Sequence, residues 1–183
     1  MKCPTCNTID LTLVYLESNL PSHHCIGCEG HWVSSSEYEV WLKRHGETLP
    51  EKQFDGTPLH VPDHGRAKLC PECGRILIKY GVGHGLNFTL EQCGHCHGVW
   101  FDKNEWGSLK QRNLHDEVHK VFTASWQTQA RKEERKRNLE RIYLNRFGSE
   151  DYAEIKRVRE WICLRQRRQE LLAFLNDVDP YDA

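Results

Sequence analysis

Eight of the nine cysteines in this 183-residue chain form four pairs, each with two residues between its thiols. The pairs are Cys3/Cys6, Cys25/Cys28, Cys70/Cys73 and Cys93/Cys96. Eighteen residues separate the first pair from the second, and 19 separate the third from the fourth. A CxxC turn directs two thiolates toward one point, so two such turns complete the tetrahedron of sulfur ligands found in structural zinc sites. The spacing therefore predicts two Zn²⁺ sites of four cysteines each.

Other uses of these cysteines fit the sequence less well. Disulfides belong mainly to exported proteins, and the first residues lack the basic start, apolar stretch and cleavage site of a secretory signal. We therefore expect a cytoplasmic protein. Exchangeable dithiols of a redox enzyme or a thiol-based metal sensor stay open as an alternative. The remaining Cys163 follows Trp161 and Ile162, which predicts a small buried side chain in a helix.

The composition favours small modules over one large core. Hydrophobic residues make up 38% of the chain and charged residues 28%. Domains of fewer than about 40 residues usually need a metal or a disulfide to fold, and each cysteine block is about that small. The net charge of −1 indicates that the chain as a whole is no polyanion binder. No apolar run approaches the roughly 20 residues that span a bilayer, so we expect no membrane contact.

Residues 1–46 and 68–112 are two copies of one pattern. Between its cysteine pairs, each copy alternates apolar and polar residues as a half-buried strand does. The alternating positions are Leu11, Leu13 and Tyr15 in the first copy and Ile76, Ile78, Tyr80, Leu86, Phe88 and Leu90 in the second. A β-hairpin with one metal-binding turn before it and another after it is a zinc ribbon.

A helix is expected after the last cysteine of each copy. Ser34 and Asp102 are good N-cap residues, and Glu37 and Glu105 follow three residues later, as a capping box requires. This spacing explains Asp102 and Glu105 without any catalytic role. Gly46 is a plausible end for the first helix. Trp32 and Trp100 are expected to pack across the metal site as local core.

These residues resemble the transcription factor IIB-type zinc-ribbon (zinc-finger) family, in two tandem copies. The shared pattern is CPxC followed by L-E-x-C-x-x-C-x-G-x-W-F-D-x-x-E, which residues 90–105 match almost letter for letter. The first copy departs from it at His23, His24, Val33 and Ser34. The resemblance covers about half of the chain and implies metal ligation. It also implies an activity related to transcription or to nucleic acid.

The rest of the chain predicts a connector and a helical tail. Residues 47–67 are rich in glycine and proline, which indicates an extended linker, so we expect the ribbons to have separate cores. Residues 113–183 predict an α-helical extension in which Gly148 separates two long helices. Apolar stripes on both helices, including Leu139, Phe147 and Ile155, would be buried if the helices packed as an antiparallel, coiled-coil-like hairpin.

The tail also carries positive charge. Residues 131–168 contain thirteen Lys or Arg and seven Asp or Glu, a surplus that could contact phosphates. We favour a solvated helix face as the explanation, because Glu133 can pair with Arg137 and Lys136 with Glu140, and these acids dilute the positive field. The histidines near the cysteines, His24, His31, His95 and His97, are expected outside the coordination shells, which four sulfurs already fill.

We therefore expect an α+β protein of two metal-stapled zinc ribbons, each a β-hairpin plus a short helix, followed by a long helical hairpin. Filled four-sulfur sites favour a non-enzymatic protein without a small-molecule substrate. Its expected role is docking onto a macromolecular partner, in transcription or another nucleic-acid process. A protein–protein adaptor without nucleic-acid contact and an RNA- or ribosome-associated factor are the alternatives.

Overall fold

The computed structural model describes residues 1–45, 59–62 and 65–182. The predicted helix end at Gly46 and most of the predicted linker, residues 47–58 and 63–64, lie outside the described residues. The described chain forms two compact units, residues 1–133 and 134–183. Both ribbons lie within the first unit.

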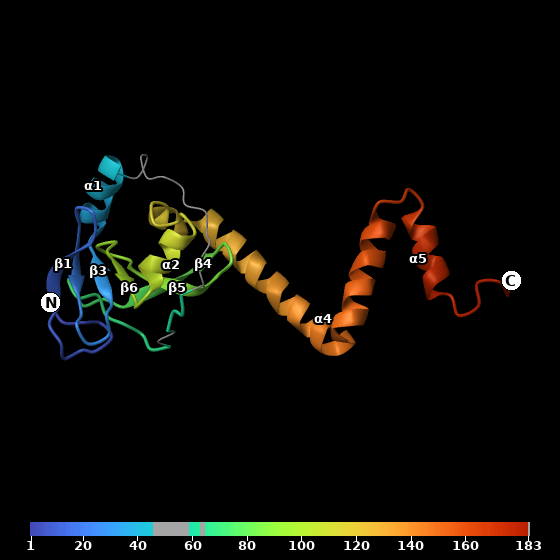
Figure 1. Cartoon of the computed structure of the whole chain (residues 1–183), viewed down its shortest axis with the longest axis horizontal. Helices are drawn as coiled ribbons and strands as arrows, with labels where there is room; N and C mark the ends of the chain where they lie inside the picture. Colours follow the sequence, from blue (N-terminus) through green and yellow to red (C-terminus); the bar gives the residue numbers. More distant parts are fainter. Residues whose placement is uncertain (46–58, 63–64, 183) are drawn as a thin grey trace. The chain divides into compact units, whose positions relative to one another are not determined.

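The first unit is built on an antiparallel sheet of six strands (Figure 1). The strands of the first ribbon are β1 (Thr12–Glu17), β2 (Leu20–His24) and β3 (His31–Val33). Those of the second are β4 (Leu77–Gly83), β5 (Leu86–Cys93) and β6 (Val99–Phe101). The hairpins β1–β2 and β4–β5 occur where the alternating pattern predicted them. Together with the helices described below, they confirm the predicted class of α+β zinc-ribbon modules followed by a helical region.

The expectation of separate cores is wrong. The strand order is β1-β2-β3-β6-β5-β4, so the two ribbons join edge to edge through β3 and β6. In that pairing Trp32 lies opposite Trp100 and Val33 opposite Val99. The physical reason is that each three-residue strand would otherwise leave its backbone donors and acceptors on an open edge. Joining the two edges satisfies both ribbons at once.

Two tryptophans pack across this junction. A side chain at Gly30 would place its Cβ 2.2 Å from Cζ2 of Trp100, and one at Gly98 would lie 2.2 Å from Cζ2 of Trp32. Each indole therefore packs directly on the backbone of the other ribbon, where only glycine leaves room. Both indoles are fully buried. Trp32 also donates from Nε1 to Oε1 of Glu72 in the second ribbon, at 2.9 Å.

Three helices cover one face of the sheet, and the two cysteine groups lie on the other face. The helices are α1 (Ser35–His45), α2 (Glu105–Gln111) and α3 (Val118–Val121). Because neighbouring strand residues point to opposite faces, Val33 and Phe101 meet the helices while Trp32 and Trp100 face the cysteines. The helix-side core combines both ribbons. Its buried members include Leu20, Val33, Tyr38, Trp41, Val82, Leu90, Phe101, Trp106, Leu109, Val118 and Val121.

The start of the long helix α4 (Ala124–Cys163) belongs to this first unit. Gln127 pairs with the backbone of Gly81 on the edge strand β4, accepting from its N–H at 3.2 Å and donating to its carbonyl at 2.9 Å. Trp126 donates from Nε1 to the carbonyl of Val82 at 2.7 Å. The helix thus occupies part of the open edge of the sheet, a common protection against edge pairing.

The second unit consists of the rest of α4 and α5 (Arg168–Asn176). Gly148, with φ 79° and ψ 169°, interrupts α4 where the sequence predicted a helix end. The predicted burial of both apolar stripes is wrong, because Leu139 is 51%, Phe147 42% and Ile155 47% exposed. The two halves meet near the break, where Tyr143 stacks on Tyr152, but they do not enclose a core. None of the described helices is long and apolar enough to cross a membrane.

Candidate metal centres

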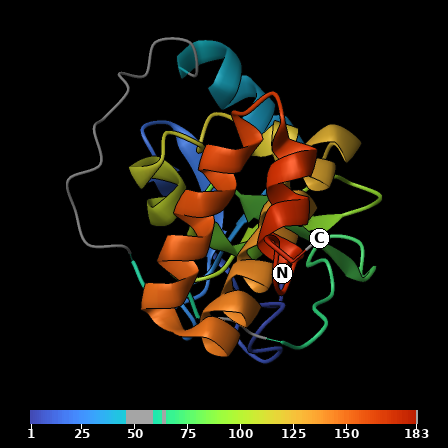
Figure 2. The ribbon, with the colours of Figure 1, turned by 90° about the vertical axis from the view of Figure 1, so that its right-hand side faces the viewer.

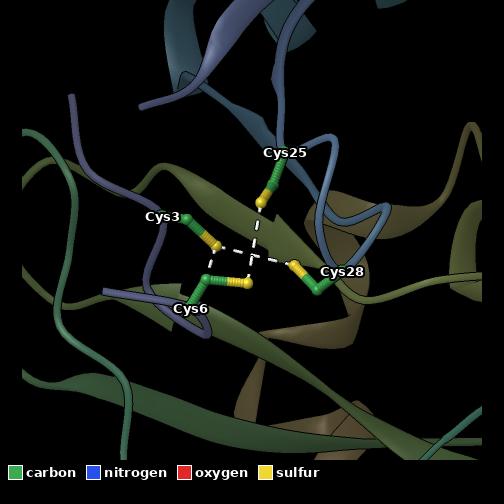
Figure 3. A group of neighbouring side chains, drawn as sticks. All are labelled: Cys3, Cys6, Cys25 and Cys28. Carbon is green, nitrogen blue, oxygen red and sulfur yellow. Dashed lines mark hydrogen bonds between the residues drawn. The ribbon is translucent and has the colours of Figure 1, made fainter. Parts of the chain in front are cut away.

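The first group of four cysteines converges from both ends of the β1–β2 hairpin (Figure 3). Cys3 and Cys6 lie in the turn before β1, and Cys25 and Cys28 in the turn after β2. The Sγ atoms of Cys3 and Cys28 are 3.5 Å apart, and those of Cys6 and Cys25 3.8 Å. All four Sγ atoms lie within 4.8 Å of one another.

The second group repeats this arrangement around the β4–β5 hairpin. The Sγ atoms of Cys70 and Cys96 are 3.5 Å apart, and those of Cys73 and Cys93 3.4 Å. All four again lie within 4.8 Å of one another. The structure thus brings together all eight cysteines that the spacing singled out, in the two predicted sets.

The geometry of both groups fits Zn²⁺. A tetrahedral zinc ion with bonds of about 2.3 Å to sulfur sets its ligands about 3.8 Å apart. The distances of 3.4 to 3.8 Å between sulfurs agree with that value. All nine cysteines are free thiols, so no disulfide competes for these sulfurs. Two structural Zn²⁺ sites with four cysteines each account for both clusters.

The electrostatics of the clusters also call for a cation. Burial raises the pKa of the Cys3 and Cys70 thiols to about 11. Burial opposes ionisation of Cys93 as well, but hydrogen bonds from the backbone N–H groups of Cys96 and His95 lower its pKa to about 7. Four thiolates within one small volume repel one another, and a bound divalent ion reverses that penalty.

A model of the transcription factor zinc-finger family, the zinc ribbon of the IIB type, matches residues 2–44 and 69–112. Both ribbons are zinc ribbons of this family. The two matched segments coincide with the two cysteine groups and their hairpins. None of the curated proteins and none of the solved structures that were searched matches the chain.

Each zinc-ribbon site is complete with sulfur. Catalytic zinc keeps one coordination position open for water or substrate, whereas structural zinc has four protein ligands. The nearby histidines lie outside the two four-sulfur groups. His31 is hydrogen-bonded to Ser22 at 3.1 Å, and the centre of its ring lies 4.6 Å from that of the tilted His24 ring. Burial, followed by the neighbouring His24, lowers the pKa of His31 to about 4, so this imidazole is neutral at physiological pH.

A buried ion network beside the second zinc ribbon escaped the sequence analysis. The Lys68 ammonium contacts Oδ2 of Asp102 at 2.5 Å and Oε1 of Glu91 at 3.0 Å. All three side chains are at most 5% exposed. Trp100 donates from Nε1 to the other oxygen of Asp102 at 2.8 Å. The sequence holds one indication of this network. Lys68 and Glu91 each stand two residues before a cysteine, at positions where the first copy has Met1 and His23.

This network corrects the predicted cap of the second helix. Ser34 does cap α1, since its Oγ accepts from the backbone N–H of Glu37 at 3.3 Å. Asp102 does not cap α2, which begins at Glu105 after Asn104. The reason is that both carboxylate oxygens of Asp102 are engaged by Lys68 and Trp100. Half of the expected box survives, because Glu105 accepts from the backbone N–H of Asp102 at 2.8 Å.

Glu105 carries an electrostatic cost in this position. It is 2% exposed, and the carboxyl groups of Glu91, Asp102 and Glu105 lie within 4.8 Å of one another. Burial, and after it the charge of Asp102, raises the pKa of Glu105 well above its usual value. Lys68 supplies most of the positive charge that holds this acidic group together, and Lys79 adds to it at 3.8 Å from Oε1 of Glu91. We interpret it as part of the scaffold of the second ribbon.

Cys163 also differs from its prediction. It is exposed at the end of α4, whereas the neighbouring Ile162 is buried. A helix turns by about 100° per residue, so the two side chains face different directions.

Proposed function

We propose that this chain is a non-enzymatic zinc-binding protein whose paired ribbons and helical extension dock onto a macromolecular partner. The observation that carries the proposal is the pair of complete four-cysteine sites within a single sheet. A filled shell supplies shape and stability and no reaction centre. The family supports the same function, because zinc ribbons of this type are named for a transcription factor.

The partner that we favour is a protein, in the cytoplasm. Large apolar side chains are exposed on the first unit, among them Leu13 at 62%, Tyr15 at 69% and Ile26 at 74%. Leu13 and Tyr15 lie on β1, the strand at the free end of the six-stranded sheet. Apolar and aromatic side chains at an exposed surface are typical of protein interfaces.

A nucleic acid is the other partner class, in line with the family name and with the basic residues of α4. An electrophoretic mobility shift with single- and double-stranded DNA and RNA, at low and moderate salt, tests it. Retention that falls steeply with salt supports nucleic-acid binding, because phosphate contacts release counterions. The absence of a shift at micromolar protein leaves the protein–protein adaptor.

The decisive test of the proposal is cross-linking in the native cell, followed by identification of what the full-length protein contacts. The wild type is compared with the double variant Leu13→Ser and Tyr15→Ser, which removes apolar surface without touching either cysteine group. We expect a discrete protein partner whose recovery falls in this variant. Recovery of no partner, together with turnover of a small molecule by the zinc-loaded protein, would overturn the proposal.

A thiol-based redox or metal sensor is a second candidate, favoured by the exposure of Cys73. In that case the zinc-loaded protein should react with a thiol probe at one or more of the eight site cysteines. Protection of all eight, with modification of Cys163 alone, would dismiss it.

A further inference from the structure

The second unit has an apolar surface and almost no interior. Among residues 134–182, Ile162 is the one buried apolar side chain. Tyr152, Val158 and Leu171 are half-buried, and thirteen other large apolar side chains of the unit are 40% or more exposed. They are Leu139, Ile142, Tyr143, Leu144, Phe147, Ile155, Trp161, Leu164, Leu172, Phe174, Leu175, Val178 and Tyr181. Helices in water are stabilised mainly by packing of an apolar face, so this unit requires a cover.

An apolar groove lies between the second half of α4 and α5. These two helix segments lie next to each other in Figures 1 and 2. The volume of the groove is about 560 Å³. The apolar lining is Ile155, Val158, Ile162, Leu172 and Leu175. Each helix contributes one wall of the groove. None of the residues of α5 is buried. A helix with an apolar face fits such a groove.

The charges of α5 identify which helix would fit. Arg165, Arg167 and Arg168 stand before and at its first residue, and Asp177 and Asp179 stand just after its last. This order opposes the helix dipole, which favours acidic residues at the start and basic residues at the end. Glu170 offsets part of it by lying 3.6 Å from Arg167, in a pair that is largely exposed. The reversed ends would be favourable beside a second helix of the same charge order running antiparallel.

That second helix is available in another copy of this chain. When two copies of α5 pack antiparallel about Leu172, Arg167 of each lies level with Asp177 of the other, five residues from the centre on either side. Arg165 and Asp179 are level in the same way, seven residues from the centre. Leu172 and Leu175 of each copy then enter the groove of the other. A two-fold interface of this kind buries the same surface on both copies.

We propose that the second unit is a homodimerisation module, in which two copies of α5 pack antiparallel in the grooves between α5 and the second half of α4. The resulting arrangement is a bundle of four helix segments. It covers the apolar groove and pairs each basic end with an acidic end. The proposal does not depend on the partner that the zinc ribbons bind.

A charge swap tests this inference on the full-length, zinc-loaded protein. The first variant, Arg165→Glu with Arg167→Glu, makes both ends of α5 acidic. The second, Asp177→Arg with Asp179→Arg, makes both ends basic. Sedimentation velocity should find the wild type as a dimer, twice the chain mass of 21.5 kDa, and each variant alone at least about tenfold weaker in self-association. An equimolar mixture of the two variants should form a heterodimer with restored affinity. In that heterodimer each acidic end of α5 in one variant lies beside a basic end of α5 in the other.

Controls separate this result from misfolding. Lys43→Glu with Arg44→Glu makes the same change of charge on α1 and should leave the dimer intact. Two zinc ions per chain in every variant show that the ribbons are folded. The inference is overturned if the wild type is a monomer at about 100 µM, a concentration at which even weak dimers assemble. A mixture that stays monomeric, or dimers that ignore both charge changes, would overturn it equally, and would favour nucleic acid or a different protein as the cover.

Discussion

Lys68 shows how one buried residue holds several others in place. Its ammonium group neutralises Asp102 and Glu91, and Asp102 in turn fixes the indole of Trp100 at the junction of the ribbons. Removing one partner of a buried ion pair leaves an uncompensated charge, which is costly. We therefore expect Lys68→Met to lower the free energy of unfolding by about 3–5 kcal/mol, measured by urea unfolding in the presence of zinc.

The matched control for Lys68→Met removes the opposing charges at the same time. Adding Glu91→Gln and Asp102→Asn keeps the shapes of the side chains and the acceptor for Trp100, so most of the lost stability should return. A loss below about 1 kcal/mol in Lys68→Met alone, within the range of exposed pairs, would contradict the role given to this lysine.

Glu105 predicts a dependence of stability on pH. Because burial and Asp102 raise its pKa in the folded protein, its contribution to stability is fully present below the unfolded pKa. That contribution is lost as the pH rises through the folded pKa. Glu105→Gln keeps an oxygen that can accept from the N–H of Asp102 but cannot ionise. The melting temperature of the Gln variant relative to the wild type should therefore increase as the pH rises above the ordinary carboxyl pKa of 4.5, and a difference that falls as the pH rises would refute the assignment.

The roles of single residues could be predicted from the sequence where a chemical requirement fixes their spacing. The cysteines could be grouped correctly because zinc requires four sulfurs and a CxxC turn supplies two of them. Asp102 could not be assigned correctly, since an N-cap and a buried ion pair use the same residue type. The choice between them depends on Lys68, which becomes a neighbour only when the sheet forms.

The junction of β3 and β6 is the element on which the first unit depends. Gly30→Ala or Gly98→Ala would place a methyl group 2.2 Å from Trp100 or Trp32, respectively. Overpacking a tight interior costs about 1–3 kcal/mol or more. Both variants should therefore unfold at lower denaturant concentration than the wild type. Gly65→Ala is the control, because a side chain there meets nothing within 4 Å, and equal stability of all three variants would contradict the junction.

The sequence predicted each hairpin but not the sheet that joins them. Alternation along Leu86, Phe88 and Leu90 indicates a strand whatever its neighbour is. Pairing of Trp32 with Trp100 depends on residues 68 positions apart, and no local pattern encodes it. The glycines before the tryptophans were visible as part of a repeat, yet their role appears only when each is seen beneath the indole of the other ribbon.

The two units of the whole molecule are stabilised in different ways. The first has a core on each face of its sheet, one built on aliphatic and aromatic side chains and one on cysteines and indoles. The second exposes most of its apolar residues and is stabilised by association, in the dimer proposed above. The helix break at Gly148 followed from its glycine, but the missing interior did not, because a stripe of apolar residues predicts burial without naming what buries it.

Metal content tests the central claim most directly, namely that two sulfur-bound zinc ions hold the paired ribbons in one sheet. Native mass spectrometry of the full-length protein should give two zinc ions per chain, still two in Cys163→Ser, and one in Cys73→Ser. Chelation of zinc should abolish the near-ultraviolet circular dichroism signal of the buried tryptophans, because folding of small zinc modules requires the metal. Well under two zinc ions in clean wild-type protein, or a tryptophan signal unchanged by the chelator, would contradict the account.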